Sequence, residues 1–137
     1  MKKIYRVVAG IMMREGKLLC GKRSEGFFSS KWEFPGGKIN PKETKVEALT
    51  REIKEEIDCD VKHNVFFMSV VAEKPDFIVQ LDSYLIDCGD EIPKRNVHSE
   101  IKWIAISDLG NYDWCDADKI IVERILSDES KFIETCL

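Results

Sequence analysis

Three glutamates are grouped on one predicted helix: Glu52, Glu55 and Glu56, at spacings i, i+3 and i+4. At about 100° per residue, these side chains gather on one flank of the helix, beside its apolar stripe. Like charges at this spacing repel, and each pair costs an isolated helix about 0.2–0.5 kcal/mol. Carboxylate oxygens are the ligands that Mg²⁺ prefers, and Mg²⁺ also binds phosphate oxygens. The cluster therefore indicates a divalent-cation site.

A glycine pair, Gly36-Gly37, comes shortly before this helix. Glycine has no Cβ, so its backbone allows close approach of a ligand or a metal to main-chain oxygens. The alternative is that a helix rich in Glu and Lys is simply a solvated surface, as most charged runs are. That alternative leaves the glycine pair and the fixed offset between Arg51-Glu52 and Glu55-Glu56 unexplained, but periodicity alone does not decide between them.

The elements that must position this cluster follow from hydrophobic patterning. The stripe of Val46, Leu49, Ile53 and Ile57 predicts a core-facing helix, with Pro41 in its first turn. Apolar and β-branched runs predict strands at Ile4–Met13, Leu18–Lys22, Val61–Val71, Phe77–Ile86 and Ile101–Ile106.

Two further segments frame the helix and end the chain. Trp32–Phe34 is predicted to be a short extended piece that Pro35-Gly36-Gly37 stops, after a loop at Gly26–Lys31. Asp116 is predicted to cap a last helix. The apolar face of that helix is Ile120, Ile121, Ile125 and Leu126. Strands and two helices together predict one α/β (α+β) domain over residues 1–137.

Composition excludes several function classes. Hydrophobic residues make up 44% and charged residues 34%, which is ordinary for a soluble globular protein. The net charge of −4 argues against a mainly electrostatic nucleic-acid binder. Five scattered cysteines without a CxxC pair, and two histidines, disfavour a structural zinc site or a disulfide framework. Free thiols favour a cytoplasmic location, and no apolar run is long enough to span a membrane.

The glycine, the arginine and the glutamates also fit one long signature. Its fixed positions here are Gly37, Glu43, Arg51, Glu52, Glu55 and Glu56, and this pattern resembles the Nudix box. Trp32–Lys38 is similar to the entry to that box in the MutT-type branch. The resemblance implies the Nudix fold, a mixed central β-sheet sandwiched between helices.

One departure from the signature lies at its end. The box usually closes with a glycine and an aliphatic residue, and here these positions hold Asp58 and Cys59. Asp is among the few residues that tolerate the left-handed backbone of a helix end, and Cys acts as a small hydrophobe. We therefore expect a slightly costlier helix end and an intact site.

The resemblance implies roles position by position. Nudix hydrolases cleave nucleoside diphosphates linked to another group, using Mg²⁺ or Mn²⁺ and a water nucleophile. The implied metal ligands are Gly37, Glu52, Glu55 and Glu56. Arg51 would orient Glu52 and Glu43 through charge-assisted bonds. The base that activates water is implied to be Glu52 or a loop carboxylate, for which Glu100 is the candidate.

Substrate contacts are implied at three further positions. Arg23 would meet the phosphates, and Phe34 would pack against the base or ribose, although Phe34 could equally be a core residue. Asp118 would read the base edge, as in the branch called CTP pyrophosphohydrolase, or would only favour the dipole of the last helix. An ionised Asp accepts hydrogen bonds only, so it would seek donors on the base. Aromatic residues that could flank the base are Phe27, Phe28 and Phe77.

The resemblance thus implies a MutT-like nucleoside triphosphate pyrophosphohydrolase, a monomer or weak homodimer with no nucleic-acid or membrane partner. It would act on an oxidised purine nucleotide such as 8-oxo-dGTP, or on CTP or dCTP. The alternatives are a nucleotide-sugar or dinucleotide hydrolase, which the short chain disfavours, and a non-catalytic nucleotide sensor. Sensors of this kind typically lose box carboxylates, and here all three are present.

Overall fold

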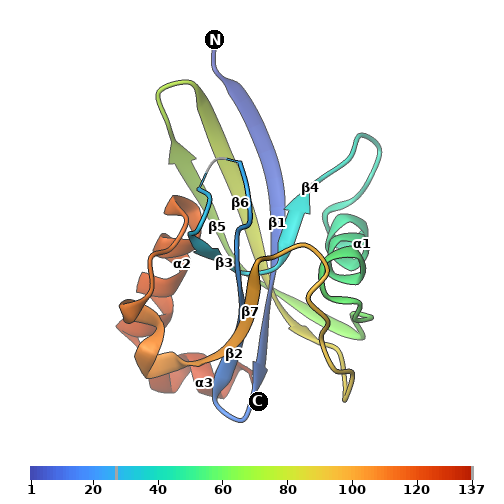
Figure 1. Cartoon of the computed structure of the whole chain (residues 1–137), viewed down its shortest axis with the longest axis vertical. Coiled ribbons are helices and arrows are strands. Elements are labelled where there is room, and N and C mark those ends of the chain that lie inside the picture. Colours follow the sequence, from blue (N-terminus) through green and yellow to red (C-terminus); the bar gives the residue numbers. More distant parts are fainter. Residues whose placement is uncertain (27, 137) are drawn as a thin grey trace.

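A long first strand, β1 (Lys3–Arg14), runs through the centre of a seven-stranded mixed sheet (Figure 1). The computed structural model describes residues 1–26 and 28–136. β1 pairs in parallel with β6 (Phe77–Asp87), and β5 (His63–Glu73) pairs antiparallel with β6 at the sheet edge. On the other side of β1 lie β2 (Lys17–Lys22), β3 (Trp32–Glu33), β4 (Gly36–Lys38) and β7 (Glu100–Ala105).

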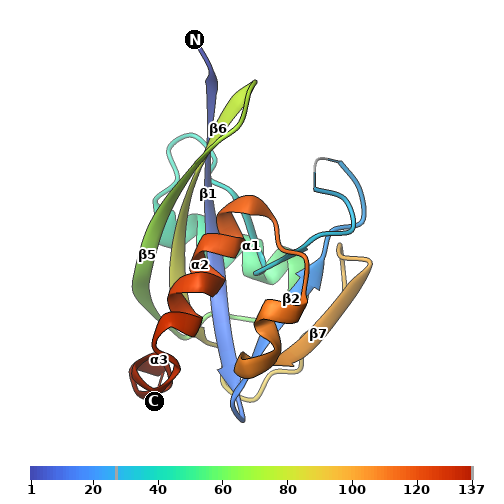
Figure 2. The ribbon, with the colours of Figure 1, turned by 90° about the vertical axis from the view of Figure 1, so that its left-hand side faces the viewer.

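Helices cover both faces of this sheet. In Figure 2, α2 (Asp116–Ser127) lies in front of β1 and α1 (Lys45–Ile57) lies behind it, with α3 (Glu129–Cys136) on the side of α2. Each face has its own core cluster, one with Leu49, Ile53 and Ile57 of α1, the other with Ile121 and Ile125 of α2. The structure confirms the predicted mixed sheet between helices. No helix in the described ranges is both long and apolar enough to cross a membrane.

The glycine pair belongs to a strand that the sequence did not predict. Extended structure was expected to stop at Pro35, but Gly36–Lys38 pairs antiparallel with β1. The physical reason is an open edge, because β2 pairs only with the last two residues of β1, Met13 and Arg14. The remaining backbone groups on that edge of β1 can bond to β4, which carries Gly37 to the start of the site.

The first residue of helix α1 is Lys45, four residues after Pro41. Thr44 is the N-cap, and its hydroxyl accepts from the Glu47 N–H while the Glu47 carboxylate accepts from the Thr44 N–H. Pro41 instead occupies a turn closed by the bond from Glu43 N–H to the Asn40 carbonyl, so its predicted place in the first helical turn is wrong. Proline favours the second position of such a turn, and Lys42 follows with a positive φ of 71°.

The end of α1 has the left-handed backbone that Asp was expected to tolerate there. Asp58 is the C-cap with a left-handed backbone, φ 55°, and its N–H donates to the Lys54 carbonyl at 3.0 Å. Cys59 is buried in the α1 core cluster. The helix therefore ends at the usual place without the glycine, and Lys54 and Lys94 form ion pairs with the Asp58 carboxylate.

The buried side of α1 is rotated relative to the predicted stripe. Val46 is 40% exposed, while Ala48 is fully buried. The buried arc is thus wider than the predicted stripe and is centred toward Glu52 and Glu56. This rotation brings these two carboxylates against the sheet.

The C-terminal region differs from expectation in three places. Cys115, not Asp116, is the N-cap of α2, and Asp116 is its first helical residue. Ile120 is exposed, because α2 packs through Ala117, Ile121 and its neighbours instead. A 3₁₀ helix, η1 (Ile106–Asn111), and α3 were not predicted. Phe132 of α3 is buried, and it packs edge-on against Phe67 of β5.

The cap of α1 gives a stability prediction. Thr44→Ala removes the hydroxyl that accepts from Glu47, so the free energy of unfolding should fall by about 1 kcal/mol. Thr50→Ala is the matched control, since the Thr50 hydroxyl only donates back to the Val46 carbonyl inside the same helix. Urea denaturation of both variants tests this. Equal losses in the two variants would contradict the capping role.

Candidate active site

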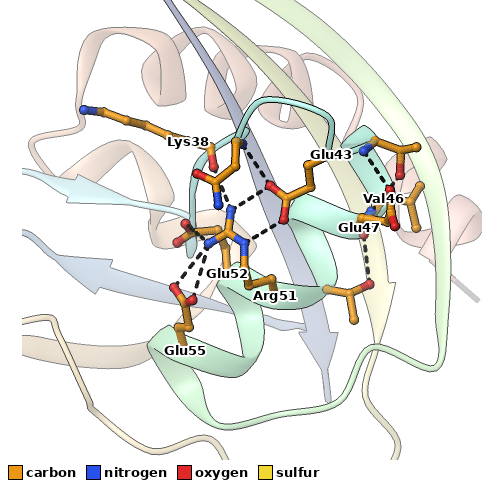
Figure 3. Close-up of polar contacts among 10 residues, drawn as sticks. Lys38, Glu43, Val46, Glu47, Arg51, Glu52 and Glu55 are labelled. Atoms are coloured by element: carbon orange, nitrogen blue, oxygen red, sulfur yellow. Dashed lines mark hydrogen bonds and ion pairs between the residues drawn. The ribbon is translucent and has the colours of Figure 1, made fainter.

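Arg51 is the centre of an ion-pair network on the outer side of α1 (Figure 3). Its Nε and Nη2 atoms donate to the two Glu43 carboxylate oxygens at 2.7 and 2.8 Å. Nη1 donates to Glu52 Oε1 at 2.7 Å, and Nη2 also donates to the Lys38 carbonyl at 2.9 Å. The guanidinium lowers the pKa of Glu43 to about 2. The structure therefore brings Arg51 together with both glutamates that the sequence assigned to it.

The three box glutamates differ in burial. Only 14% of the Glu52 side chain and 15% of the Glu56 side chain are exposed, against 56% for Glu55. The Glu55 carboxylate is 3.3 Å from Arg51 Nη1 and otherwise faces solvent. The cluster consists of two carboxylates held against the sheet and a third at its rim.

Glu52 lies against Gly37. A Cβ atom at position 37 would come within 2.3 Å of Glu52 Oε2, so only glycine leaves room for this carboxylate beside β4. Burial raises the pKa of Glu52, and the Arg51 guanidinium opposes that shift. The carboxylate and the main chain of Gly37 are therefore neighbours, as a shared metal site requires.

Glu56 is the more strongly perturbed acid. Its Oε1 accepts from the Gly36 N–H at 3.0 Å, and burial raises its pKa to about 7, with His98 opposing and Glu33 adding to the shift. Two buried carboxylates on one helix face are electrostatically costly unless a cation compensates them. Oxygen donors such as those of Glu52, Glu56 and Gly37 are the type that suits Mg²⁺ or Mn²⁺. Among the described residues, Glu52, Glu55 and Glu56 do not form a ligand group with all atoms within 4.8 Å of one another, whereas Glu56 forms one with Glu33 and His98.

A cavity of about 290 Å³ adjoins this cluster at Gly36 and Gly37. It brings together all three residues predicted to bind substrate, Arg23, Phe34 and Asp118, and it is also lined by Glu33, Phe28 and Phe77. Arg23 forms an ion pair with Glu33 at 3.0 Å. Phe27 lies outside the described residues. The cavity therefore joins the predicted nucleotide contacts to the carboxylate cluster.

Phe34 and Asp118 both line this cavity and contact each other. Asp118 Oδ1 accepts from the Phe34 N–H at 3.0 Å, and the Phe34 ring is buried in a stacked contact with Trp114, 5.1 Å between centroids. Burial, with Glu33 nearby, raises the pKa of Asp118 well above its usual range. The ionised state assumed from the sequence is therefore disfavoured, and a protonated Asp118 can donate as well as accept.

Glu100 is not brought to the cluster. It is exposed at the start of β7, and its charge acts on Lys102, two residues further along the strand. Ile101 and Trp103, which alternate with these residues, pack toward the α1 core. Because successive side chains of a strand point to opposite faces, Glu100 and Lys102 lie on the face away from α1.

The structure adds Glu33 and His98 to the site, two residues that the sequence analysis did not single out. His98 Nε2 is 3.0 Å from Glu33 Oε2 and 3.8 Å from Glu56 Oε1. The three side chains could together hold a cation. A charged residue between the apolar Trp32 and Phe34 was the available signal for Glu33, whereas His98 lies in a loop with no pattern to mark it.

Comparison with known proteins identifies the family of this chain. The NUDIX domain family model matches residues 4–125. An 8-oxo-dGTP diphosphatase of Haemophilus influenzae is 31% identical over 134 residues, covering 96% of this chain and 98% of the relative. A CTP pyrophosphohydrolase of Escherichia coli is 27% identical over 126 residues, covering 91% and 93%.

Solved structures are similar over nearly the whole fold. A MutT NUDIX hydrolase from Burkholderia pseudomallei superposes with a TM-score of 0.83 at 22% identity, covering 90% of this chain and 99% of that one. The E. coli ORF135 protein superposes with a TM-score of 0.82 at 26% identity, covering 95% and 94%. The chain belongs to the NUDIX domain family. It is accordingly a Nudix hydrolase.

The Arg51 network predicts a catalytic defect without a binding defect. Arg51→Lys keeps a charge but loses the planar fork that grips Glu43 and Glu52, so kcat should fall about 10- to 100-fold with KM little changed. Steady-state kinetics at saturating Mg²⁺ measure both. Lys54→Ala is the control, because Lys54 pairs with Asp58 and Asp60 at the far end of α1. A large rise in KM alone would place Arg51 on the substrate instead.

Proposed function

We propose that this protein is a metal-dependent nucleoside triphosphate pyrophosphohydrolase that releases a nucleoside monophosphate and pyrophosphate. The observation that carries the proposal is the shared wall at Gly36 and Gly37 between the carboxylate cluster and the cavity. A nucleotide with its base near Asp118 would extend its phosphates past Arg23 toward Glu52 and Glu56. The names of the two curated relatives support nucleoside triphosphates as the substrate class.

We assign the residues of the site separate roles in metal binding and in positioning. Glu52, Glu56 and the Gly37 carbonyl would hold the divalent cation, with Glu55 completing the set from the rim. When bound, that cation neutralises pyrophosphate charge and lowers the pKa of water. Arg51 fixes the Glu52 carboxylate.

We assign the general base to Glu52 rather than Glu100. Support for this choice comes from the position of Glu52 beside Gly37 and from the placement of Glu100 on the other face of β7.

The base would be read by Asp118 together with the main chain of Phe34. A protonated Asp118 offers one hydrogen-bond donor and one acceptor. A guanine-type or cytosine edge carries a complementary acceptor and donor. We therefore propose 8-oxo-dGTP or CTP and dCTP as substrates. The H. influenzae and E. coli relatives carry the names of these two activities.

A substrate panel tests the proposed function. The wild-type protein is assayed with 8-oxo-dGTP, dGTP, CTP and dCTP, and with ADP-ribose for comparison, in Mg²⁺, and the products are separated by ion-exchange chromatography. We expect monophosphate and pyrophosphate, with one nucleotide preferred by at least about tenfold in kcat/KM, or about 1.4 kcal/mol. Glu52→Gln should abolish most turnover. Release of inorganic phosphate, or cleavage of ADP-ribose in preference to all four triphosphates, would refute the proposal.

The role of Asp118 is tested with the same panel. Asp118→Ala removes the side-chain donor and acceptor, and a hydrogen bond between neutral groups is worth about 0.5–1.5 kcal/mol, so kcat/KM for the preferred nucleotide should fall roughly 2- to 13-fold for each bond lost. Asp118→Asn keeps a neutral donor and acceptor, so it should retain turnover and the ranking of nucleotides that Asp118→Ala loses. Thermal denaturation of both variants provides the folding control. A ranking of nucleotides that is unchanged in Asp118→Ala would leave Asp118 only a structural role.

A further inference from the structure

His98 is a buried histidine that links two strands to the box helix. Its side chain is 2% exposed, and Nε2 lies 3.0 Å from Glu33 Oε2 on β3 and 3.8 Å from Glu56 Oε1 on α1. A carboxylate only accepts hydrogen bonds, so the contact with Glu33 places the ring proton on Nε2. Among the residues described, Nδ1 of His98 is the one buried side-chain nitrogen or oxygen without a hydrogen-bond partner.

The ring rests on the backbone of β2 at Gly21. A Cβ atom at position 21 would lie 2.5 to 2.6 Å from Cδ2, Cγ and Nε2 of the imidazole, so glycine is required for the ring to sit there. The main chain around the ring is also fixed. Arg95 Nη1 donates to the His98 carbonyl at 3.0 Å, and the Ser99 N–H donates to the Lys22 carbonyl at 2.9 Å. The imidazole therefore packs against the β2 backbone on one side, and its Nε2 atom faces the Glu33 and Glu56 carboxylates.

We propose that His98 is a positioning residue that fixes Glu33 and Glu56 in the orientation needed to bind the divalent cation. This inference rests on the proposed function, since it assumes that Glu56 is a metal ligand. Glu56 receives one hydrogen bond from the Gly36 N–H, and the His98 ring packs close to the same oxygen. With the ring in place, Glu33 is bonded on one oxygen to Arg23 and on the other to His98. Neither carboxylate can then rotate freely.

Groups that hold a metal ligand in place matter for affinity without touching the metal. Their loss typically weakens metal binding or activity 10- to 100-fold. The distance from the amide nitrogen of Gln to the backbone matches that of Nε2, whereas the shorter Asn reaches only as far as Nδ1. His98→Gln should therefore preserve the contact with Glu33, and His98→Asn should remove it.

The experiment measures Mn²⁺ binding to the metal-free protein by electron paramagnetic resonance, in parallel with kcat and KM. His98→Asn should raise the Mn²⁺ dissociation constant about 10- to 100-fold, and His98→Gln should stay within about threefold of wild type. Gly21→Ala displaces the ring without altering a polar group, so it should behave like His98→Asn. His63→Asn, at an exposed histidine on β5, is the matched control. At saturating metal, KM for the preferred nucleotide should change little.

The outcomes separate this inference from the proposed function. Wild-type Mn²⁺ affinity in folded His98→Asn and Gly21→Ala proteins would overturn the positioning role. Equal losses for Gln and Asn would also overturn it, since a histidine that ligates the metal directly would give that result. If His98→Asn does not fold, the comparison of Gly21→Ala with His98→Gln decides. A protein that binds Mn²⁺ as expected but hydrolyses no nucleoside triphosphate would refute only the proposed function.

Discussion

The burial of two carboxylates on one face of α1 is the constraint around which the rest of this structure is arranged. Glu52 and Glu56 are largely removed from water, and burial raises the pKa of both. Such groups destabilise a fold unless hydrogen bonds and charges surround them. Arg51 supplies these to Glu52 from the solvent side. On the sheet side the Gly36 N–H donates to Glu56, and His98 Nε2 lies 3.8 Å from the same carboxylate oxygen. Among the described residues, Glu56 together with Glu33 and His98 could hold a cation.

The pairing of β2 and β4 with β1 makes room for the buried side chains of the site. Because β2 leaves most of one edge of β1 open, β4 can pair there and carry Gly37 against Glu52. The same β2 provides Gly21, on which the His98 ring lies. Two glycines, on strands that both pair with β1, thus make space for Glu52 and for the His98 ring. A methyl group at position 37 would displace the Glu52 carboxylate, and one at position 21 would displace the ring.

Sequence patterning predicted the parts of the fold that repeat and missed those that depend on contacts between distant segments. The helix α1 and its stripe follow from periodicity, and the left-handed Asp58 follows from the chemistry of helix ends. The rotation that exposes Val46 and buries Ala48 depends on how α1 packs against the sheet, so periodicity could not give it. His98 is the clearest case, since its partners are 65 and 42 residues away along the chain. The resemblance to a known signature located the glutamates, but not this histidine.

Glu33 connects the two halves of the site. Its carboxylate bonds to Arg23 and His98, and its charge raises the pKa of both Glu56 and Asp118. A cation bound at Glu56 would reduce the repulsion between Glu33 and Glu56. A nucleobase bound at Asp118 would change the interaction between Glu33 and Asp118. Electrostatic coupling through a shared, poorly hydrated carboxylate is reciprocal, so each ligand must alter the affinity for the other. The box carboxylates and the cavity wall at Asp118 are therefore linked electrostatically through Glu33.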